Sequence, residues 1–437
     1  MMKRKMNKKK VLIISYYWPP SGGIGVHRCL KFAKYLRDFG WEPIVYAPKN
    51  AAYPYFDETN FKDIPEDITI LKKPIIEPFN LFKKLSGRKK TDSANPVYVR
   101  DKKRGWIDEL SIWIRGNLFI PDARALWIRP SVRFLKKYVQ HNPVDAILTD
   151  GPPHTNTVIG CKLAKATGIP WLADFQDPWT QVDYYNMLKI GKKADKKHRK
   201  MEQEALRTAA KITIASPTWA KDLEKIGADN VDPLFWGYDD DDFPEEFPSL
   251  DDVFSIVHAG QLGYDRRPDT LIKLLGKLKN EHPEFGRLLR IKFAGTVDYA
   301  ITSMIKDAGL ENNYEAPGNI SRPAALNMTL SAHVLLLPLN IANNAKGRIP
   351  GKLFENLRAC RPILCLGPSN SDVAKIIAET NAGTSCGYDD ENCLKSFILE
   401  RFELFTKGEN QISQGNIEKY SVRNQVKKLA GFLDNIT

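Results

Sequence analysis

Short runs of apolar residues recur along the whole chain, and each ends in a loop. Uninterrupted runs of this length are typical of strands that are buried on both faces of a parallel sheet. We expect such strands at residues 11–16, 44–47, 145–149, 169–174 and 212–216, and again at 255–260, 291–295, 334–337 and 362–367. The run at 212–216 is expected to be the last strand of the first series.

Between these runs, apolar residues recur every three or four positions, as in a helix with one buried face. One such segment carries Val26, Leu30, Ala33 and Leu36 and stops at Gly40, and another carries Leu271, Leu274, Leu275 and Leu278. Strands that alternate with helices predict the α/β class with doubly wound parallel sheets.

The strand and helix pattern starts twice, and 437 residues exceed what one ordinary hydrophobic core supports. We therefore expect two domains, the first at residues 1–235. The stretch 236–243 predicts a linker, since it holds turn residues and four consecutive aspartates. These acids lack the alternate spacing of a calcium loop, so we expect them to be solvated.

The composition and the lengths of the apolar runs indicate where in the cell the protein is expected. No apolar run is long enough to cross a bilayer, and the basic segment 1–10 precedes too short a run for a secretory signal. The six cysteines show no Cys-x-x-Cys and no zinc-like spacing. A reducing cytoplasm is therefore the default expectation.

Charge is distributed unevenly. Residues 1–212 hold 40 Lys and Arg against 21 Asp and Glu, a net +19, whereas the remainder holds 25 against 31, a net −6. The first half is thus suited to an anionic partner, or is simply basic without one. The sequence contains no nucleic-acid-binding motif, so we expect no nucleic-acid partner. An anionic inner membrane leaflet or a lipid-phosphate acceptor fits better, at about 1 kcal/mol of attraction per nearby basic residue.

Aromatic and basic residues mix at 104–129. Trp106, Ile107, Leu110, Trp113 and Ile114 fit an amphipathic helix, with Trp and Arg suited to an interface. Such a stripe indicates either ordinary core or a contact with a membrane or an acceptor.

The segment 346–362 carries the most specific chemistry. Pro350 and Gly351 precede a short helix, and a first turn with free N–H groups and Lys352 favours an anion. Glu355 could accept hydrogen bonds from a diol such as ribose, and a diphosphate beside a diol is a nucleotide-sugar. Alternatively, Lys352 and Glu355 form a surface i,i+3 ion pair worth a few tenths of a kcal/mol.

A glycine loop follows the first strand. Gly22, Gly23 and Gly25 stand where an anion could meet a helix N-terminus, or they merely turn the chain. The third glycine of a dinucleotide fingerprint is replaced by Arg28, and residues 44–47 end without the ribose-binding acid. Hydride transfer is therefore disfavoured.

Other polar residues follow predicted strands, where ligands of doubly wound sheets bind. His154 could contact a sugar or an acceptor, or could cap the next helix. The acids at 174 and 177 could orient an acceptor hydroxyl or close a turn. Arg266 and Arg267 could grip a phosphate.

The segments 11–36, 145–179 and 350–367 resemble family-4 glycosyltransferases, in particular those of bacterial sugar-polymer synthesis. Enzymes of that family have the GT-B fold, two Rossmann-like domains that face a central cleft. The resemblance implies a donor-binding domain at 236–418 and a C-terminal helix at 419–437 that crosses back to the first domain.

The resemblance also implies the chemistry: a sugar moves, with retention, from a UDP-linked donor to a hydroxyl of a saccharide or lipid-linked acceptor. No metal or other cofactor is expected. The implied catalytic residues are Arg267 and Lys352, and the place of His154 just after a strand adds it to them. The implied donor-binding residues are Gly22, Gly23, Arg266, Asn319, Ile320, Gly351, Leu353 and Glu355. Because Asp150 and Asp177 follow strand ends, we expect them to contact the acceptor, although the resemblance fixes no role for them. The protein would lie in the cytoplasm, on the inner face of the membrane.

The chain departs from that family at two positions. Gln261 stands where an arginine is usual, and Gly347 where a second glutamate is usual. Two alternatives therefore stay open: a nucleotide-sugar 2-epimerase of the same architecture, and a non-catalytic subunit that binds a nucleotide-sugar.

Overall fold

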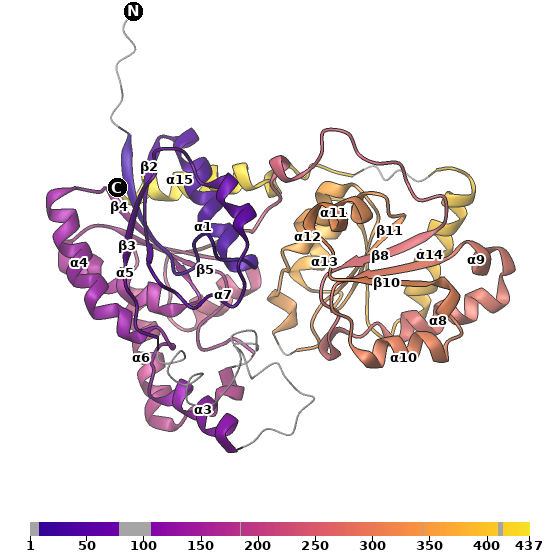
Figure 1. Cartoon of the computed structure of the whole chain (residues 1–437), viewed down its shortest axis with the longest axis horizontal. Coiled ribbons are helices and arrows are strands. Elements are labelled where there is room, and N and C mark those ends of the chain that lie inside the picture. Colours follow the sequence, from indigo (N-terminus) through magenta and orange to yellow (C-terminus); the bar gives the residue numbers. More distant parts are fainter. Residues whose placement is uncertain (1–7, 78–105, 184, 343, 410–413) are drawn as a thin grey trace, which may run out of the picture. The chain divides into compact units, whose positions relative to one another are not determined.

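A computed structural model describes residues 8–77, 106–183, 185–342, 344–409 and 414–437 (Figure 1). The chain divides into two compact units. The first consists of Met1–Phe235 together with Arg423–Thr437, and the second is Trp236–Val422. The second unit therefore starts directly after the residue at which we expected the first domain to end.

The first unit contains a seven-stranded sheet in the order β3-β2-β1-β4-β5-β6-β7, and all its strand pairs are parallel. The strands are β1 Lys9–Ile14, β2 Trp41–Pro48, β3 Thr69–Lys73, β4 Ala146–Gly151, β5 Trp171–Phe175, β6 Lys211–Ile214 and β7 Val231–Pro233. The helices are α1 Ile24–Tyr35, α3 Trp106–Asn117, α4 Ile128–His141, α5 His154–Thr167, α6 Lys192–Thr208, α7 Pro217–Lys225 and α15 Val422–Ile436. Short 3₁₀ turns lie at η1 Leu36–Phe39, η2 Glu58–Asp63, η4 Ala125–Trp127 and η5 Tyr185–Leu188.

The second unit contains a six-stranded sheet in the order β10-β9-β8-β11-β12-β13, again with parallel pairs throughout. Its strands are β8 Ser255–Ala259, β9 Arg290–Ala294, β10 Tyr314–Gly318, β11 Val334–Pro338, β12 Ile363–Leu366 and β13 Gly383–Cys386. Its helices are α8 Asp269–Glu281, α9 Pro283–Leu288, α10 Tyr299–Asp307, α11 Arg322–Leu330, α12 Lys352–Ala359, α13 Asp372–Glu379 and α14 Glu391–Thr406. The 3₁₀ turns are η6 Asp240–Asp242, η7 Tyr264–Arg266, η8 Glu311–Asn313, η9 Ala345–Gly347 and η10 Glu418–Tyr420.

These two sheets confirm the predicted class, α/β with two doubly wound, Rossmann-like domains. The apolar runs form the central strands because both faces of those strands are covered. Residues 11–14 of β1 and 334–337 of β11 are almost completely buried.

The prediction that residues 212–216 form the last strand of the first series is wrong. The chain adds β7 after β6, and β3 at the opposite edge was also missed. Both edge strands are only partly covered, so neither needs an uninterrupted apolar run: β7 is Val-Asp-Pro and β3 is Thr-Ile-Leu-Lys-Lys.

The final helix, α15, is part of the first unit except for its first residue. Val426, Leu429 and Leu433 are fully buried, and Lys9 near the start of β1 pairs with Asp434 at 3.1 Å. In Figure 1 the yellow α15 accordingly lies among the indigo elements of the first unit. Its amphipathic face therefore completes the core of that unit.

Of the four aspartates in the linker, Asp240 and Asp241 are exposed as expected, whereas Asp239 and Asp242 are less solvated than expected. Asp239 is buried, and its carboxylate accepts a hydrogen bond from the Asp241 N–H. Asp240 pairs with Arg358 at 2.6 Å, and Asp242 pairs with Arg322 at 3.0 Å. The acids therefore attach the linker to helices of the second unit.

Two further findings concern the location and the cysteines. None of the helices in the described ranges is both long and apolar enough to span a membrane. Cys386 at the end of β13 and Cys393 in the first turn of α14 form a disulfide, with the two Cα atoms 5.8 Å apart. This pair does not fit the expectation of a reducing environment.

The packing of α5 on the first sheet leads to a test of the core. A Cβ added at Gly160 would lie 2.4 Å from Thr149 Cγ2 and 2.7 Å from Trp171 Nε1, whereas at Gly431 in α15 nothing lies within 4 Å. We expect Gly160→Ala to lower the free energy of unfolding by about 1–3 kcal/mol or more, because the core is overpacked. Gly431→Ala should raise it by about 0.5–1 kcal/mol. Urea denaturation measures both, and equal effects would contradict the packing.

Candidate functional site

The parallel sheets gather the predicted site residues at one edge of each unit. In both strand orders the direction of winding reverses once, between β1 and β4 and between β8 and β11. Ligands of doubly wound sheets bind beyond the carboxyl ends of the strands at that point. Gly22 and Gly23 follow β1, and Asp150 and His154 lie at the end of β4 and just beyond it. In the second unit, the loop with Arg266 follows β8, and α12 follows β11.

The N-terminus of α12 supplies two backbone donors. The Leu353 N–H donates to the Pro350 carbonyl at 3.0 Å, so this predicted donor-binding residue has its amide occupied. Within the described part of the chain, the N–H groups of Gly351 and Lys352 donate to no backbone carbonyl. The first helical turn therefore offers two amides and one ammonium group to an anion.

The Lys352 and Glu355 side chains form the i,i+3 ion pair that the sequence left as an alternative. Lys352 Nζ lies 2.7 Å from Glu355 Oε2, and Arg322 Nη2 lies 3.7 Å from Glu355 Oε1. The side chains of the pair are 43% and 30% exposed. Pairs this exposed contribute roughly 0–1 kcal/mol, so a ligand with more charge can replace either partner.

The two arginines after β8 also pair with nearby carboxylates. Arg267 binds Asp269 through two hydrogen bonds, of 2.8 and 3.1 Å, and Arg266 lies 3.3 Å from Asp265. Asp265 in addition accepts a hydrogen bond from the Asn340 amide. These guanidinium groups are held in place at the edge of the sheet. The predicted donor-binding residues Asn319 and Ile320 lie beyond the end of β10, on that same edge.

His258 is a residue of this edge that sequence reasoning missed. It lies near the end of β8, and its Nδ1 is 2.9 Å from the Leu336 carbonyl oxygen. Its pKa is lowered to about 4 by burial and also by the positive charges of Lys352 and Arg266. Both cations therefore act on one imidazole. The only signal in the sequence is a histidine at a strand end.

In the first unit, the glycine loop pairs with the segment 55–56 through its backbone. The Gly22 N–H donates to the Tyr55 carbonyl at 2.9 Å, and Ser21 forms a bridge with Phe56. Gly23 has a φ of 80°, which favours glycine, and precedes α1. The predicted phosphate contact of the Gly22 amide would require that bond to Tyr55 to break.

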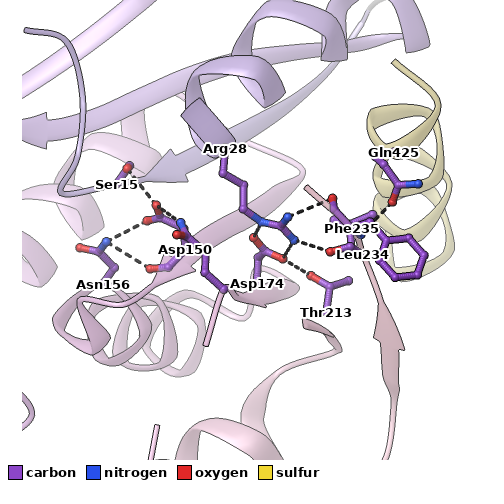
Figure 2. A network of polar contacts seen from close by, with 10 residues as sticks. Ser15, Arg28, Asp150, Asn156, Asp174, Thr213, Leu234, Phe235 and Gln425 are labelled. Carbon is purple, nitrogen blue, oxygen red and sulfur yellow. Dashed lines mark hydrogen bonds and ion pairs between the residues drawn. The ribbon is translucent and has the colours of Figure 1, made fainter. Parts of the chain in front are cut away.

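Asp150 lies in a buried polar network rather than at a surface (Figure 2). Its carboxyl group meets Asn156 Nδ2 at 2.8 Å, Ser15 Oγ at 3.2 Å and Gln176 Nε2 at 3.3 Å. Burial, together with the charge of Asp174, raises its pKa to about 7. A direct contact with an acceptor would have to replace one of these partners.

A buried ion pair lies beside that network, and it too was missed. Arg28 on α1 binds both carboxylate oxygens of Asp174 and donates to the backbone carbonyls of Leu234 and Phe235 (Figure 2). Both side chains are 0–1% exposed. Arg28, which replaces the third glycine of a dinucleotide fingerprint, thus attaches α1 to residues 234–235, where the first of the unit's two segments ends. In that end segment, the Phe235 N–H donates to Gln425 of α15 at 2.9 Å.

His154 is the first residue of α5, and it does not cap the helix. Asp122 does so instead: its carboxylate accepts from the Thr155 N–H at 2.8 Å. The His154 ring stacks on Trp179 with centroids 4.6 Å apart, and burial lowers its pKa to about 3. His154 Nδ1 has no hydrogen-bond partner among the described residues. The ring is therefore neutral at pH 7. Asp177, two residues before Trp179, is half-buried.

The remaining predictions concern metals and the surface. In the part of the chain that the structure describes, no three His, Cys, Asp or Glu side chains form a group that could hold a metal ion. On α3, Leu110 and Trp113 are about half exposed, whereas Ile112 is buried. Trp106 and Ile107 lie in the same helix, but their side chains are outside the described residues.

Comparison with solved structures identifies the fold. Sucrose-phosphate synthase from Thermosynechococcus elongatus matches with a TM-score of 0.56 and 12% identity, over 98% of this chain and 94% of that chain. Anabaena HepE, solved with UDP-glucose, matches with a TM-score of 0.57 and 12% identity, over 98% and 100%. A candidate UDP-N-acetylglucosamine 2-epimerase from Listeria monocytogenes matches with a TM-score of 0.54 and 10% identity, over 97% and 95%.

These matches extend over nearly the whole chain, and they define it as a protein of the GT-B fold. No family model matches the chain, and no curated protein sequence does. The identities of 10–12% show the fold and leave the reaction open.

The buried ion pair gives a prediction for stability. Arg28→Met should lower the free energy of unfolding by about 3–5 kcal/mol, because it leaves the Asp174 carboxylate buried without its cation. The double variant Arg28→Met/Asp174→Asn should lose less than the sum of the two single variants. Urea denaturation of all four proteins measures the coupling. Strictly additive losses would show that the two charges do not stabilise each other.

The raised pKa of Asp150 gives a prediction with a defined sign. The folded state holds this proton more tightly than the unfolded state, so the stability it contributes is full below about pH 4 and is lost as the pH rises through about 7. Asp150→Asn removes that loss. The variant should therefore be more stable than wild type at pH 8, by up to about 4 kcal/mol, and the advantage should shrink toward pH 5. Thermal unfolding across this range measures the difference, with Asp222→Asn, at a partly exposed aspartate that pairs with Lys225, as control. If the stability advantage of Asp150→Asn did not depend on pH, the raised pKa of Asp150 would be refuted.

Proposed function

We propose that the protein is a glycosyltransferase of the family-4 type that uses a nucleoside-diphosphate sugar. It moves the sugar from a UDP-linked donor to a hydroxyl of a saccharide or lipid-linked acceptor, with retention, in the synthesis of a cell-surface polysaccharide. The observation that carries the proposal is the edge of the second sheet. There, two arginines, a lysine and two unoccupied backbone amides follow the ends of β8 and β11, the point where a doubly wound sheet binds its ligand.

The second unit would hold the donor. Arg267, Lys352 and the amides of Gly351 and Lys352 would bind the diphosphate, while Glu355 would bind the ribose hydroxyls and the backbone at 319–320 the base. In the reaction the bond between the anomeric carbon and the diphosphate oxygen breaks, and the diphosphate leaves with the electron pair. The acceptor oxygen forms the new bond to that carbon, and its hydroxyl proton passes to the departing diphosphate. Preorganised cations and amides stabilise that developing charge. In this proposal no metal ion is required.

The ion pairs of this edge fit such a role. Lys352–Glu355 and Arg267–Asp269 are each between 30% and 43% exposed, so breaking either costs roughly 1 kcal/mol or less. A diphosphate carries two negative charges and accepts hydrogen bonds to charged groups, each worth about 1.5–3 kcal/mol. Binding would therefore release Glu355 from Lys352 at the moment when the ribose needs an acceptor.

The first unit would bind the acceptor. The net positive charge of residues 1–212 suits a lipid-phosphate acceptor or the anionic inner face of the membrane. Tyr55 and Phe56 are exposed and lie beside the glycine loop. His154, with an unoccupied ring nitrogen near Gly151, would contact the transferred sugar. Asp177 and, through its network, Asp150 would orient the acceptor, and the protein would act in the cytoplasm.

The role of Glu355 has a direct test. UDP and UDP-sugars should raise the thermal midpoint of wild type, and Glu355→Ala should bind them about 10- to 100-fold more weakly, because a charge-assisted hydrogen bond is lost. Glu391→Ala is a matched control: Glu391 pairs with Lys277 at 2.8 Å in the same unit, far from α12 in sequence. Titration calorimetry gives the affinities. Equal affinities for wild type and Glu355→Ala would defeat the assigned role.

A turnover assay separates the proposal from its two alternatives. Release of free nucleoside diphosphate only when an acceptor is present would support the transferase. Conversion of one nucleotide-sugar into its 2-epimer without an acceptor would replace it with the epimerase. Binding with no turnover toward any donor and saccharide or lipid-linked acceptor would leave a non-catalytic subunit.

A further inference from the structure

Four large apolar side chains are exposed where α3, η5 and the start of α6 meet. They are Leu110 at 46%, Trp113 at 45%, Leu118 at 62% and Met187 at 48% exposed. Single exposed apolar residues are ordinary, whereas a group of them marks an interaction site. These four come from two distant segments of the chain, so the fold brings them together.

Hydrogen bonds join the two segments. Asn117 Nδ2 donates to the Lys189 carbonyl at 3.1 Å, and the Gly191 N–H donates to Asn117 Oδ1 at 2.7 Å. Residues 110, 113 and 117 lie on one face of a helix. Leu110 and Trp113 therefore extend the face of α3 that contacts the residues just before α6.

The first half of α6 carries lysines on its outer side. Its buried side includes His198, whose Nε2 lies 3.4 Å from the Gly116 carbonyl oxygen of α3, and both helices lie at the same end of the first unit (Figure 1). The opposite side of α6 holds four exposed lysines, Lys192, Lys193, Lys196 and Lys197. Within the described residues, none of these four forms an ion pair with a carboxylate. Their positive charges are therefore available to an anionic partner.

Apolar side chains beside uncompensated lysines fit the surface of an anionic bilayer. Lysines are attracted by anionic headgroups, and Trp and Leu side chains enter the boundary between headgroups and acyl chains. A nucleic acid would bind the lysines and could stack on Trp113. However, it offers no counterpart to the exposed side chains of Leu110, Leu118 and Met187. A bilayer accounts for both groups of residues.

We propose that this α3–α6 surface, formed by the four apolar residues and the four lysines, docks the protein on a bilayer with anionic headgroups. The apolar side chains enter the headgroup boundary, and the lysines lie against the headgroups. The inference deepens the proposed function by assigning the surface that meets the membrane. It rests on that function only for the purpose of docking, which is to reach a lipid-linked acceptor.

The expected size follows from the charges. Each lysine near an anionic leaflet strengthens binding by roughly fivefold. Salt screens that attraction, so binding should weaken strongly between about 0.1 M and about 0.5 M salt. Insertion of the apolar side chains is not screened and should keep part of the binding at high salt.

The test is cosedimentation of the full chain with vesicles of phosphatidylcholine and phosphatidylglycerol, compared with vesicles of phosphatidylcholine alone. Wild type should prefer the anionic vesicles by about tenfold or more, and Lys193→Gln/Lys197→Gln should bind them roughly 10- to 30-fold more weakly. Lys136→Gln/Lys137→Gln is the matched control, since it removes two exposed lysines from α4 of the same unit. That control should bind within about twofold of wild type.

The apolar part of the surface has its own variants. Leu110→Ser/Trp113→Ser should weaken binding by about tenfold, and it should keep the thermal midpoint of wild type because both side chains are half exposed. Phospholipids with bromine on the acyl chains should quench the tryptophan fluorescence of bound wild type. They should quench Trp113→Phe less, because the indole that reaches the acyl boundary is then absent.

The affinity for UDP-glucose without vesicles should be the same in wild type and in all these variants, which separates docking from donor binding. Equal binding of both vesicle types, or equal losses in the α6 and α4 lysine variants, would overturn the inference and leave the proposed function standing. Tighter binding to an RNA oligonucleotide than to anionic vesicles, or self-association that depends on Trp113, would also overturn it. Vesicle docking without binding of any nucleoside-diphosphate sugar would overturn the proposed function alone.

Discussion

Parallel strand pairing is the constraint on which the rest of this protein depends. Because every described strand pair of both sheets is parallel, all strands of one sheet end at the same edge. Residues as distant in sequence as Arg266 and Lys352 are thereby brought to act on one imidazole. The single reversal in each strand order leaves a gap between the loops after β1 and β4, and after β8 and β11, where backbone amides and side chains can meet a ligand.

The two units use charge at these edges in opposite ways. In the first unit, Arg28 and Asp174 are fully buried, and breaking their contact would leave a charge without water or a partner. In the second unit, Lys352, Glu355, Arg267 and Asp269 are partly exposed, and their pairs exchange at little cost. The first arrangement suits a fixed scaffold, and the second suits residues that must change partners when a ligand binds.

The proposed reaction follows from this second arrangement rather than from the fold. The GT-B architecture is shared by transferases and by a candidate epimerase, so it restricts the ligand more than the chemistry. The second unit lacks the arginine and the glutamate that family-4 enzymes usually place at 261 and 347.

The sequence by itself determined the central strands, the helices that follow them and the restart of the pattern after residue 235. Apolar runs such as 11–14 and 334–337 are legible because complete burial requires every residue to be apolar. The sequence also predicted the start of α12, because the preferences of proline, glycine and lysine for a helix start are local. Only the tertiary structure decided the edge strands β3 and β7, whose half-covered residues need no apolar run. It alone decided that the Gly22 amide bonds to Tyr55, that Arg28 meets Asp174, and that His258 lies against the Leu336 carbonyl. Such contacts join residues tens to more than a hundred positions apart, and their energies depend on burial, which no local pattern records.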